Sequence, residues 1–165
     1  MKWLPIIVSA GFASFSFCDT NPSYKVQLDP LMTAAGYANL QVDRKVSPVL
    51  STGVMAWYLD KNSWGNGSDR DQASLGVRVD WFETGVFQTG WHSNAMVKVD
   101  FDGGNYARSR LKLTQSYQFV AAGLFMNVGI GAQFVAETSA ISDSLYNDYQ
   151  SWMLPAWEVS VGRAF

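Results

Sequence analysis

The sequence predicts an all-β fold, an eight-stranded antiparallel up-and-down transmembrane β-barrel. Three observations support it: apolar and polar residues alternate along most of the chain, short and long connections alternate, and the last segment ends on Phe165. Side chains of a strand point alternately to its two faces, so each alternating segment has one apolar and one polar face. Membrane barrels have this arrangement because their outer face meets lipid and their inner face meets a polar lumen.

The N-terminal segment indicates export. Met1 and Lys2 precede an apolar stretch that reaches Phe17, too short for a membrane-spanning helix but of signal-peptide length. We expect residues 1–18 to be a signal peptide cleaved after Cys18, and residues 19–165 to form one outer-membrane β-barrel domain. Acylation of Cys18, as in a lipoprotein, is disfavoured because a bulky phenylalanine precedes it where a lipobox has a small residue.

Composition fits a membrane barrel better than a soluble globule. Aromatic residues make up 15% of the chain and charged residues only 16%, yet the mean hydropathy is −0.03. Such an average is expected when half of every strand faces a polar lumen. The net charge of −2, without a basic cluster, gives no indication of nucleic-acid binding.

Eight segments carry the alternation, and their apolar faces are almost free of charge. The segment 49–59 is apolar on both faces, so either Leu50, Val54 and Tyr58 or Met55 and Trp57 could face lipid. The predicted strands are 24–28, 38–45, 49–59, 73–81, 87–101, 106–119, 124–137 and 157–165.

The connections alternate in length, as they do in bacterial barrels. Short turns are predicted at Ser47-Pro48, Glu83-Thr84 and Val120-Ala122, and the longest loops at 60–72 and 138–150. Short turns lie on the periplasmic side, and an even number of strands places the end of the last strand there too. The predicted interface aromatic residues are Trp81, Trp157 and Phe165.

The polar faces predict a lumen filled with paired charges. Eight strands enclose a space only just wide enough for side chains, and desolvated charges need partners. The charges predicted to face inward are nearly balanced in sign, which favours a salt-bridged plug over an ion-selective pore. No cofactor or metal site is expected, because the chain has one histidine and one cysteine. The predicted charge network is Arg78, Asp80, Lys98, Asp100, Arg108, Arg110, Lys112, Glu137 and Glu158.

Two stretches near the N-terminus resemble a known family. The segment Leu28-Asp29-Pro30-Leu31, followed by Gly36 to Lys45, is similar to an uncharacterised family of small outer-membrane barrel proteins, which has asparagine in place of Asp29. More distantly, the chain resembles the OmpA transmembrane domain and the OmpX type of barrel. The resemblance implies a fold and a location in the bacterial outer membrane, but no activity.

One motif suggests an enzyme. His92-Ser93-Asn94-Ala95 is similar to the His-x-Ser-Asn-Ala motif of lipid A deacylases, and this resemblance implies a hydrolase with a serine nucleophile. Here His92 and Ser93 are adjacent, so a regular strand points them to opposite faces unless a β-bulge intervenes. A lipid A-modifying hydrolase is therefore an alternative function, and a small channel is another.

The leading hypothesis is an outer-membrane protein with a structural or surface-interaction role. Its expected partners are outer-membrane lipid and lipopolysaccharide, together with the barrel-assembly machinery, which would bind the C-terminal strand ending at Phe165. We expect a monomer without a nucleic-acid partner.

Overall fold

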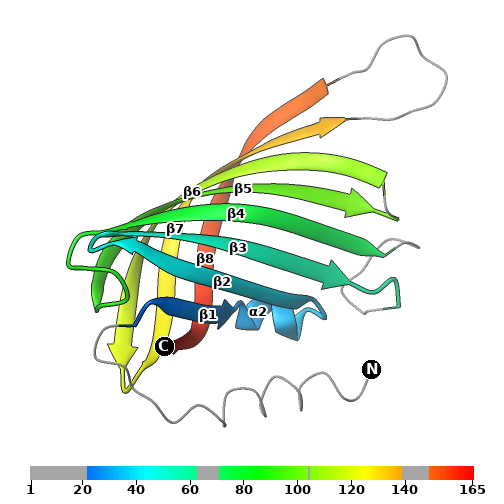
Figure 1. The fold of residues 1–165 in the computed structure, drawn as a ribbon. Helices are drawn as coiled ribbons and strands as arrows, with labels where there is room; N and C mark the ends of the chain where they lie inside the picture. Colours follow the sequence, from blue (N-terminus) through cyan, green and yellow to red (C-terminus); the bar gives the residue numbers. More distant parts are fainter. Residues whose placement is uncertain (1–21, 63–70, 104, 139–148) are drawn as a thin grey trace, which may run out of the picture.

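The structure is a single sheet of eight antiparallel strands closed into a barrel (Figure 1). The computed structural model describes residues 22–62, 71–103, 105–138 and 149–165, so the predicted signal peptide lies outside the described residues. Each strand pairs with its neighbours in sequence, and β8 pairs with β1 to close the sheet. The predicted all-β, eight-stranded antiparallel up-and-down barrel is confirmed. The elements are β1 (Tyr24–Leu28), α2 (Pro30–Ala34), β2 (Ala38–Ser47), β3 (Leu50–Leu59), β4 (Gln72–Phe82), β5 (Gly90–Asp102), β6 (Asn105–Ala121), β7 (Leu124–Thr138) and β8 (Tyr149–Ala164).

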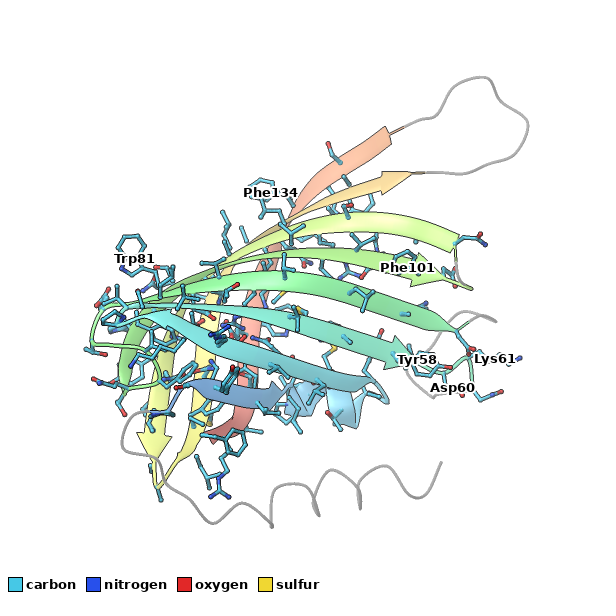
Figure 2. All side chains as sticks on the ribbon, in the orientation of Figure 1. Tyr58, Asp60, Lys61, Trp81, Phe101 and Phe134 are labelled. Carbon is cyan, nitrogen blue, oxygen red and sulfur yellow. The ribbon has the colours of Figure 1, made fainter. Side chains whose placement is uncertain are left out.

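The outer surface of the barrel is apolar. Ile130, for example, is 75% exposed although it lies in the middle of β7. Trp81 and Phe134 likewise point away from the barrel (Figure 2). In β3, Val54 and Tyr58 are exposed whereas Met55 is buried. This answers the question left open by the sequence, because β3 presents its Val54 and Tyr58 face to the outside.

The two ends of the barrel differ. We call the end with the connections 48–49, 83–89 and 122–123 the turn end, and the opposite end the loop end. At the loop end, the hairpin of β7 and β8 extends past the place where β8 stops pairing with β1, and β6 accompanies β7 as far as Glu137 (Figure 1). β8 begins at Tyr149, so it is longer than the predicted strand 157–165.

One turn prediction is wrong. The short turn predicted at Glu83-Thr84 is instead the longer connection 83–89, which folds back against the turn end, where the Val86 amide donates to the Pro48 carbonyl at 2.9 Å. Phe87, predicted on the outer face, is only 4% exposed, and its φ is 63°. Gly85, at φ 131°, adopts a conformation that side chains disfavour, and this permits the reversal.

A short helix follows β1 at the loop end. Asp29 caps α2 by accepting hydrogen bonds from the amides of Leu31 and Met32 at 2.9 and 3.0 Å. The side-chain oxygen of Asn39 accepts a hydrogen bond from the Asp29 amide at 2.5 Å, which links the start of the helix to β2. Among the described residues, no helix is long and apolar enough to cross a bilayer.

Candidate functional site in the barrel lumen

The lumen is lined by polar side chains, as the alternation predicts. Along β5 every even-numbered residue from His92 to Asp100 is buried, whereas the odd-numbered residues between them are exposed or half-buried. The same alternation holds in β4 and β8 around Arg78 and Glu158. The inward faces of β4 around Arg78, of β5 from His92 to Asp100 and of β8 around Glu158 are thus the predicted ones.

An aromatic cap closes the turn end. It consists of Phe82, Val86, Phe87 and Phe125, each at most 5% exposed. The ring of Phe82 packs edge-on against that of Phe87, with centroids 6.2 Å apart. This cap was not predicted, because the chain reversal that brings Phe87 inward has no periodic signal. The signal available in the sequence was the pair of glycines at positions 85 and 90 that bracket the segment.

A buried lysine lies against the cap. The ammonium of Lys25 is 4.8 Å from the ring centroid of Phe125 and 5.4 Å from that of Phe87, so it makes cation–π contacts. It also lies 3.3 Å from the Asp43 carboxylate, and both side chains are fully buried. The amide groups of Gln27 and Gln41 donate to the same carboxylate at 3.1 and 2.8 Å. Charge at this end of the lumen is therefore compensated.

The middle of the lumen holds a second compensated cluster, the central network. Its hub is Glu158, whose carboxylate pairs with Arg78 at 2.8 Å and accepts from the Asn94 side chain at 2.5 Å. The hydroxyls of Thr114 and Ser116 donate to Glu158 at 3.1 and 2.9 Å. Arg78 also pairs with Asp80. The side chains of the central network come from four strands, and all are buried: Arg78, Asp80, Asn94, Thr114, Ser116 and Glu158.

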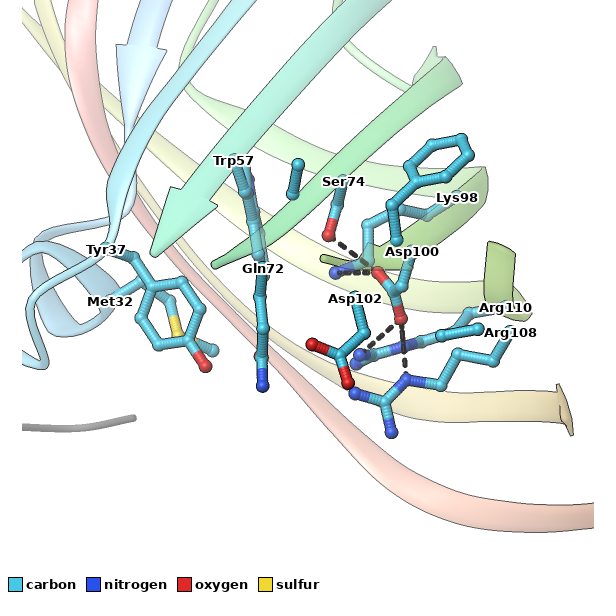
Figure 3. A pocket seen from close by; sticks show the side chains of 13 residues that line it. Met32, Tyr37, Trp57, Gln72, Ser74, Lys98, Asp100, Asp102, Arg108 and Arg110 are labelled. Carbon is cyan, nitrogen blue, oxygen red and sulfur yellow. Dashed lines mark hydrogen bonds and ion pairs between the residues drawn. The ribbon is translucent and has the colours of Figure 1, made fainter. Parts of the chain in front are cut away.

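The loop end holds a third cluster around Asp100 (Figure 3). One oxygen of this carboxylate accepts from Ser74 at 2.6 Å and lies 3.3 Å from the Lys98 ammonium. The other lies 2.8 Å from Nε of Arg108 and 2.5 Å from a terminal nitrogen of Arg110. Three cations therefore share one carboxylate.

This cluster lines a cavity of about 260 Å³, which we call the vestibule. Trp57 forms part of its wall, and the Lys98 ammonium sits 3.8 Å from the centroid of the Trp57 ring. Tyr37 packs edge-on against Trp57, with centroids 6.3 Å apart. The vestibule side chains Trp57, Lys98 and Arg110 also line a smaller cavity of about 100 Å³ that reaches Lys112.

Lys112 lies apart from the Asp100 cluster. Its ammonium donates to the main-chain carbonyl of Trp157 at 2.6 Å. Asp29, which lines the same small cavity, uses its carboxylate to cap α2. Burial raises the pKa of Asp29, although the backbone amides of Met32 and Leu31 act in the opposite direction.

The predicted charge network is thus divided. Arg78, Asp80 and Glu158 belong to the central network, whereas Lys98, Asp100, Arg108 and Arg110 form the vestibule cluster. The side chain of Glu137 lies outside the described residues. Charge patterning alone missed the neutral partners, which are the polar members of the same alternating faces, namely Gln27, Gln41, Ser74, Asn94, Thr114 and Ser116.

The predicted interface aromatic residues lie on the outer wall or at its edge. Trp81 and Trp157 are 65% and 59% exposed. Phe165 is half-buried, and its amide donates to the Tyr24 carbonyl at 2.8 Å. Their position in a membrane interface stays a prediction.

The suggested hydrolase pair is separated. His92 is fully buried in the lumen, where its ring stacks on Phe82 with centroids 4.8 Å apart. Ser93 is on the outer face and donates to the Gln115 side chain at 2.5 Å. The pairing of β4 with β5 is regular at both positions, so no bulge brings the two side chains together. This geometry does not provide a nucleophile with a base.

No group of three or more histidine, cysteine or acidic side chains within the described ranges could hold a metal ion. No protein-family model, no curated protein and no solved structure matches this chain. The fold and the lumen therefore define its class, an eight-stranded up-and-down β-barrel with an apolar exterior and a charged interior.

Proposed function

We propose that the protein is a monomeric barrel of the bacterial outer membrane with a structural or surface-interaction role. The observation that carries this proposal is the polarity of the wall. Large apolar side chains such as Leu75 and Ile130 are exposed, whereas Lys25, Asp43 and Asp80 are completely buried. A soluble barrel has the opposite arrangement, with an apolar interior and a wet exterior. The strands together present an apolar belt around the outside of the barrel, and such a belt is compatible with lipid contact.

The connections support an orientation. Outer-membrane barrels keep short turns on the periplasmic side and longer loops outside. The turn end would then face the periplasm, and the loop end, with the extension of β7 and β8, would face the exterior. Lipid and lipopolysaccharide would contact the apolar wall, and the barrel-assembly machinery would engage the closing strand β8. Any surface interaction would use the loop end.

A channel is less well supported than a closed scaffold. The aromatic cap and the central network lie one behind the other in the lumen, and their side chains are buried. An eight-stranded barrel has an interior wide enough for its side chains or one small ligand, but not for an aqueous channel. The separation of His92 from Ser93 likewise leaves the hydrolase alternative without geometric support.

Fractionation tests the proposal. The full-length chain, expressed in a Gram-negative host, is expected in the outer-membrane fraction and to need detergent for purification. An intact barrel resists dodecyl sulfate at room temperature, so the unboiled protein should migrate differently from the boiled protein on a gel. Recovery as a soluble periplasmic protein without detergent would contradict the membrane assignment.

A further inference from the structure

The vestibule carries more positive charge than its ion pairs compensate. Lys98, Arg108 and Arg110 have one carboxylate within 4.0 Å in the described part of the chain, that of Asp100. The side chains of Arg108 and Arg110 are 34% and 23% exposed, so water reaches them. Cations held together in a cavity repel one another, and an anion relieves that repulsion.

Lys112 adds a fourth cation. Its ammonium donates to the neutral carbonyl of Trp157, and within the described ranges no carboxylate lies within 4.0 Å of it. Arg110 lines both the vestibule and the cavity that reaches Lys112. The two cavities therefore present one continuous set of positive groups.

Two further carboxylates line these cavities. Asp29 directs its carboxylate to the amides of α2. Asp102 lines the vestibule, but it forms no ion pair within 4.0 Å with a described cation, and its Oδ1 receives no hydrogen bond. Among the described charged groups that line the two cavities, the four cations Lys98, Arg108, Arg110 and Lys112 outnumber the three carboxylates Asp29, Asp100 and Asp102 by one.

The donors are arranged for an oxyanion. Asp100 engages Arg108 through Nε, and none of the described acceptors pairs with the two terminal nitrogens of that guanidinium. A guanidinium fork with adjacent ammonium groups matches the oxygens of a phosphate. The vestibule volume of about 260 Å³ leaves room for a phosphate group with a small organic substituent, which the aromatic wall formed by Trp57 and Tyr37 would contact.

We infer that the vestibule and the adjoining smaller cavity form a binding site for a phosphate group, with Arg108 and Arg110 lining the vestibule and Arg110 and Lys112 lining the smaller cavity. This inference rests on the lumen geometry and does not depend on the membrane assignment. A phosphate can come from two sources, a dissolved phosphorylated molecule that enters at the loop end or the headgroup of a phospholipid.

The sheet is interrupted beside the small cavity. β1 pairs only with the last part of β8, from Val161, which lies opposite Leu28, to Ala164, which lies opposite Lys25. β8 itself begins much earlier, at Tyr149. The small cavity is lined at this place by Pro155, which has no amide hydrogen to leave unpaired. A headgroup would therefore have to pass α2, which contacts both β2 and β8 beside this interruption of the sheet.

Calorimetric titration of the purified barrel in a neutral maltoside detergent tests the inference. The probes are glycerol 3-phosphate for the dissolved source and a lysophosphatidylglycerol for the headgroup, with glycerol as the uncharged control. Saturable binding of either phosphate probe, without binding of glycerol, is expected. Binding of the first alone identifies a dissolved ligand, and preference for the second identifies a lipid headgroup.

Variants locate the site. The double substitution Arg110→Gln with Lys112→Gln should weaken phosphate binding at least tenfold, and Arg110→Lys should retain most of it. The control is Arg44→Gln, which removes an exposed arginine from the outer face and should change nothing. If the double variant does not fold, Arg108→Gln replaces it, because Arg108 is the most exposed of the three cations around Asp100.

Gel mobility before and after boiling shows whether each sample is a folded barrel, which separates this test from that of the membrane assignment. No saturable binding of either phosphate probe to the folded barrel would overturn the inference. So would equal weakening by Arg44→Gln, because the binding would then arise from overall charge.

Discussion

The two halves of the lumen handle charge differently. In the central network, Arg78 and Glu158 are 2% and 5% exposed and pair with each other. In the vestibule, one carboxylate serves three cations, and two of these are 23% and 34% exposed. A buried charge must be compensated by protein groups, whereas a charge in contact with water need not be. Access to water therefore distinguishes the two clusters, although both lie on the same alternating strand faces. The central network is structural, whereas the vestibule cations can still bind an anion.

The largest effect is expected from breaking the central network. Glu158→Gln would leave Arg78 with a single carboxylate partner in a buried layer, so we expect a loss of about 3–5 kcal/mol in the free energy of unfolding. Equilibrium urea unfolding in detergent measures it. Glu83→Gln, on an exposed connection, is the control and should change stability by about 0.5 kcal/mol or less. A similar small change for Glu158→Gln would show that the network contributes little.

The second-largest loss of stability is expected from opening the aromatic cap. Phe82→Ala removes a ring that is 1% exposed and packs on Phe87 and His92. A loss of about 3 kcal/mol is expected from the cavity. Phe119→Ala removes an exposed ring from the outer face, where detergent fills the space, and should cost less. In planar bilayers neither variant should conduct, because the central network still fills the lumen. Stable conductance in Phe82→Ala would mean that the cap alone closes the barrel.

The vestibule should be more tolerant. Asp100→Asn removes the only carboxylate that pairs with three described cations, but water reaches two of them. We expect a loss of about 2 kcal/mol, less than for Glu158→Gln, in the same urea titration. Because the variant raises the net positive charge, it should bind glycerol 3-phosphate more tightly than the parent. Equal destabilisation by the two substitutions would remove the distinction between the halves.

The smallest loss of stability is expected from removing a single hydroxyl group in the vestibule. Ser74→Ala removes one donor to Asp100, at 2.6 Å, from a partly exposed carboxylate cluster. About 1 kcal/mol is expected. Thr114→Ala, which removes a donor to Glu158 from the buried network, is the matched comparison and should cost more. The opposite order would indicate that the vestibule is the better-packed half.

The alternation of residues predicts which side chains face inward, because strand geometry alone decides it. Leu75 and Arg78, for example, lie on the predicted faces of β4. Where both faces are apolar, as in β3, the sequence left the direction open, and the pairing of β3 with β2 and β4 determines it. Phe87 was misplaced because the reversal at Gly85 depends on backbone freedom rather than on periodicity.

The division of the charges could not be predicted either. Arg78 and Lys98 occupy equivalent inward positions in the sequence pattern, yet one meets Glu158 and the other Asp100. Glu158 and Arg78 are far apart in sequence and meet only because the sheet closes. Contacts across a lumen depend on strand stagger and tilt, which periodicity does not encode.

Thiol accessibility tests the division of the lumen most directly. Single cysteines would replace Ser74, which lines the vestibule, and Ser116, which is fully buried in the central network, in a chain where Cys18 is serine. A small water-soluble methanethiosulfonate reagent should label the cysteine at position 74 rapidly and the one at position 116 only after unfolding. Rapid labelling of both in the folded barrel would contradict the closed central network, and protection of both would contradict the open vestibule.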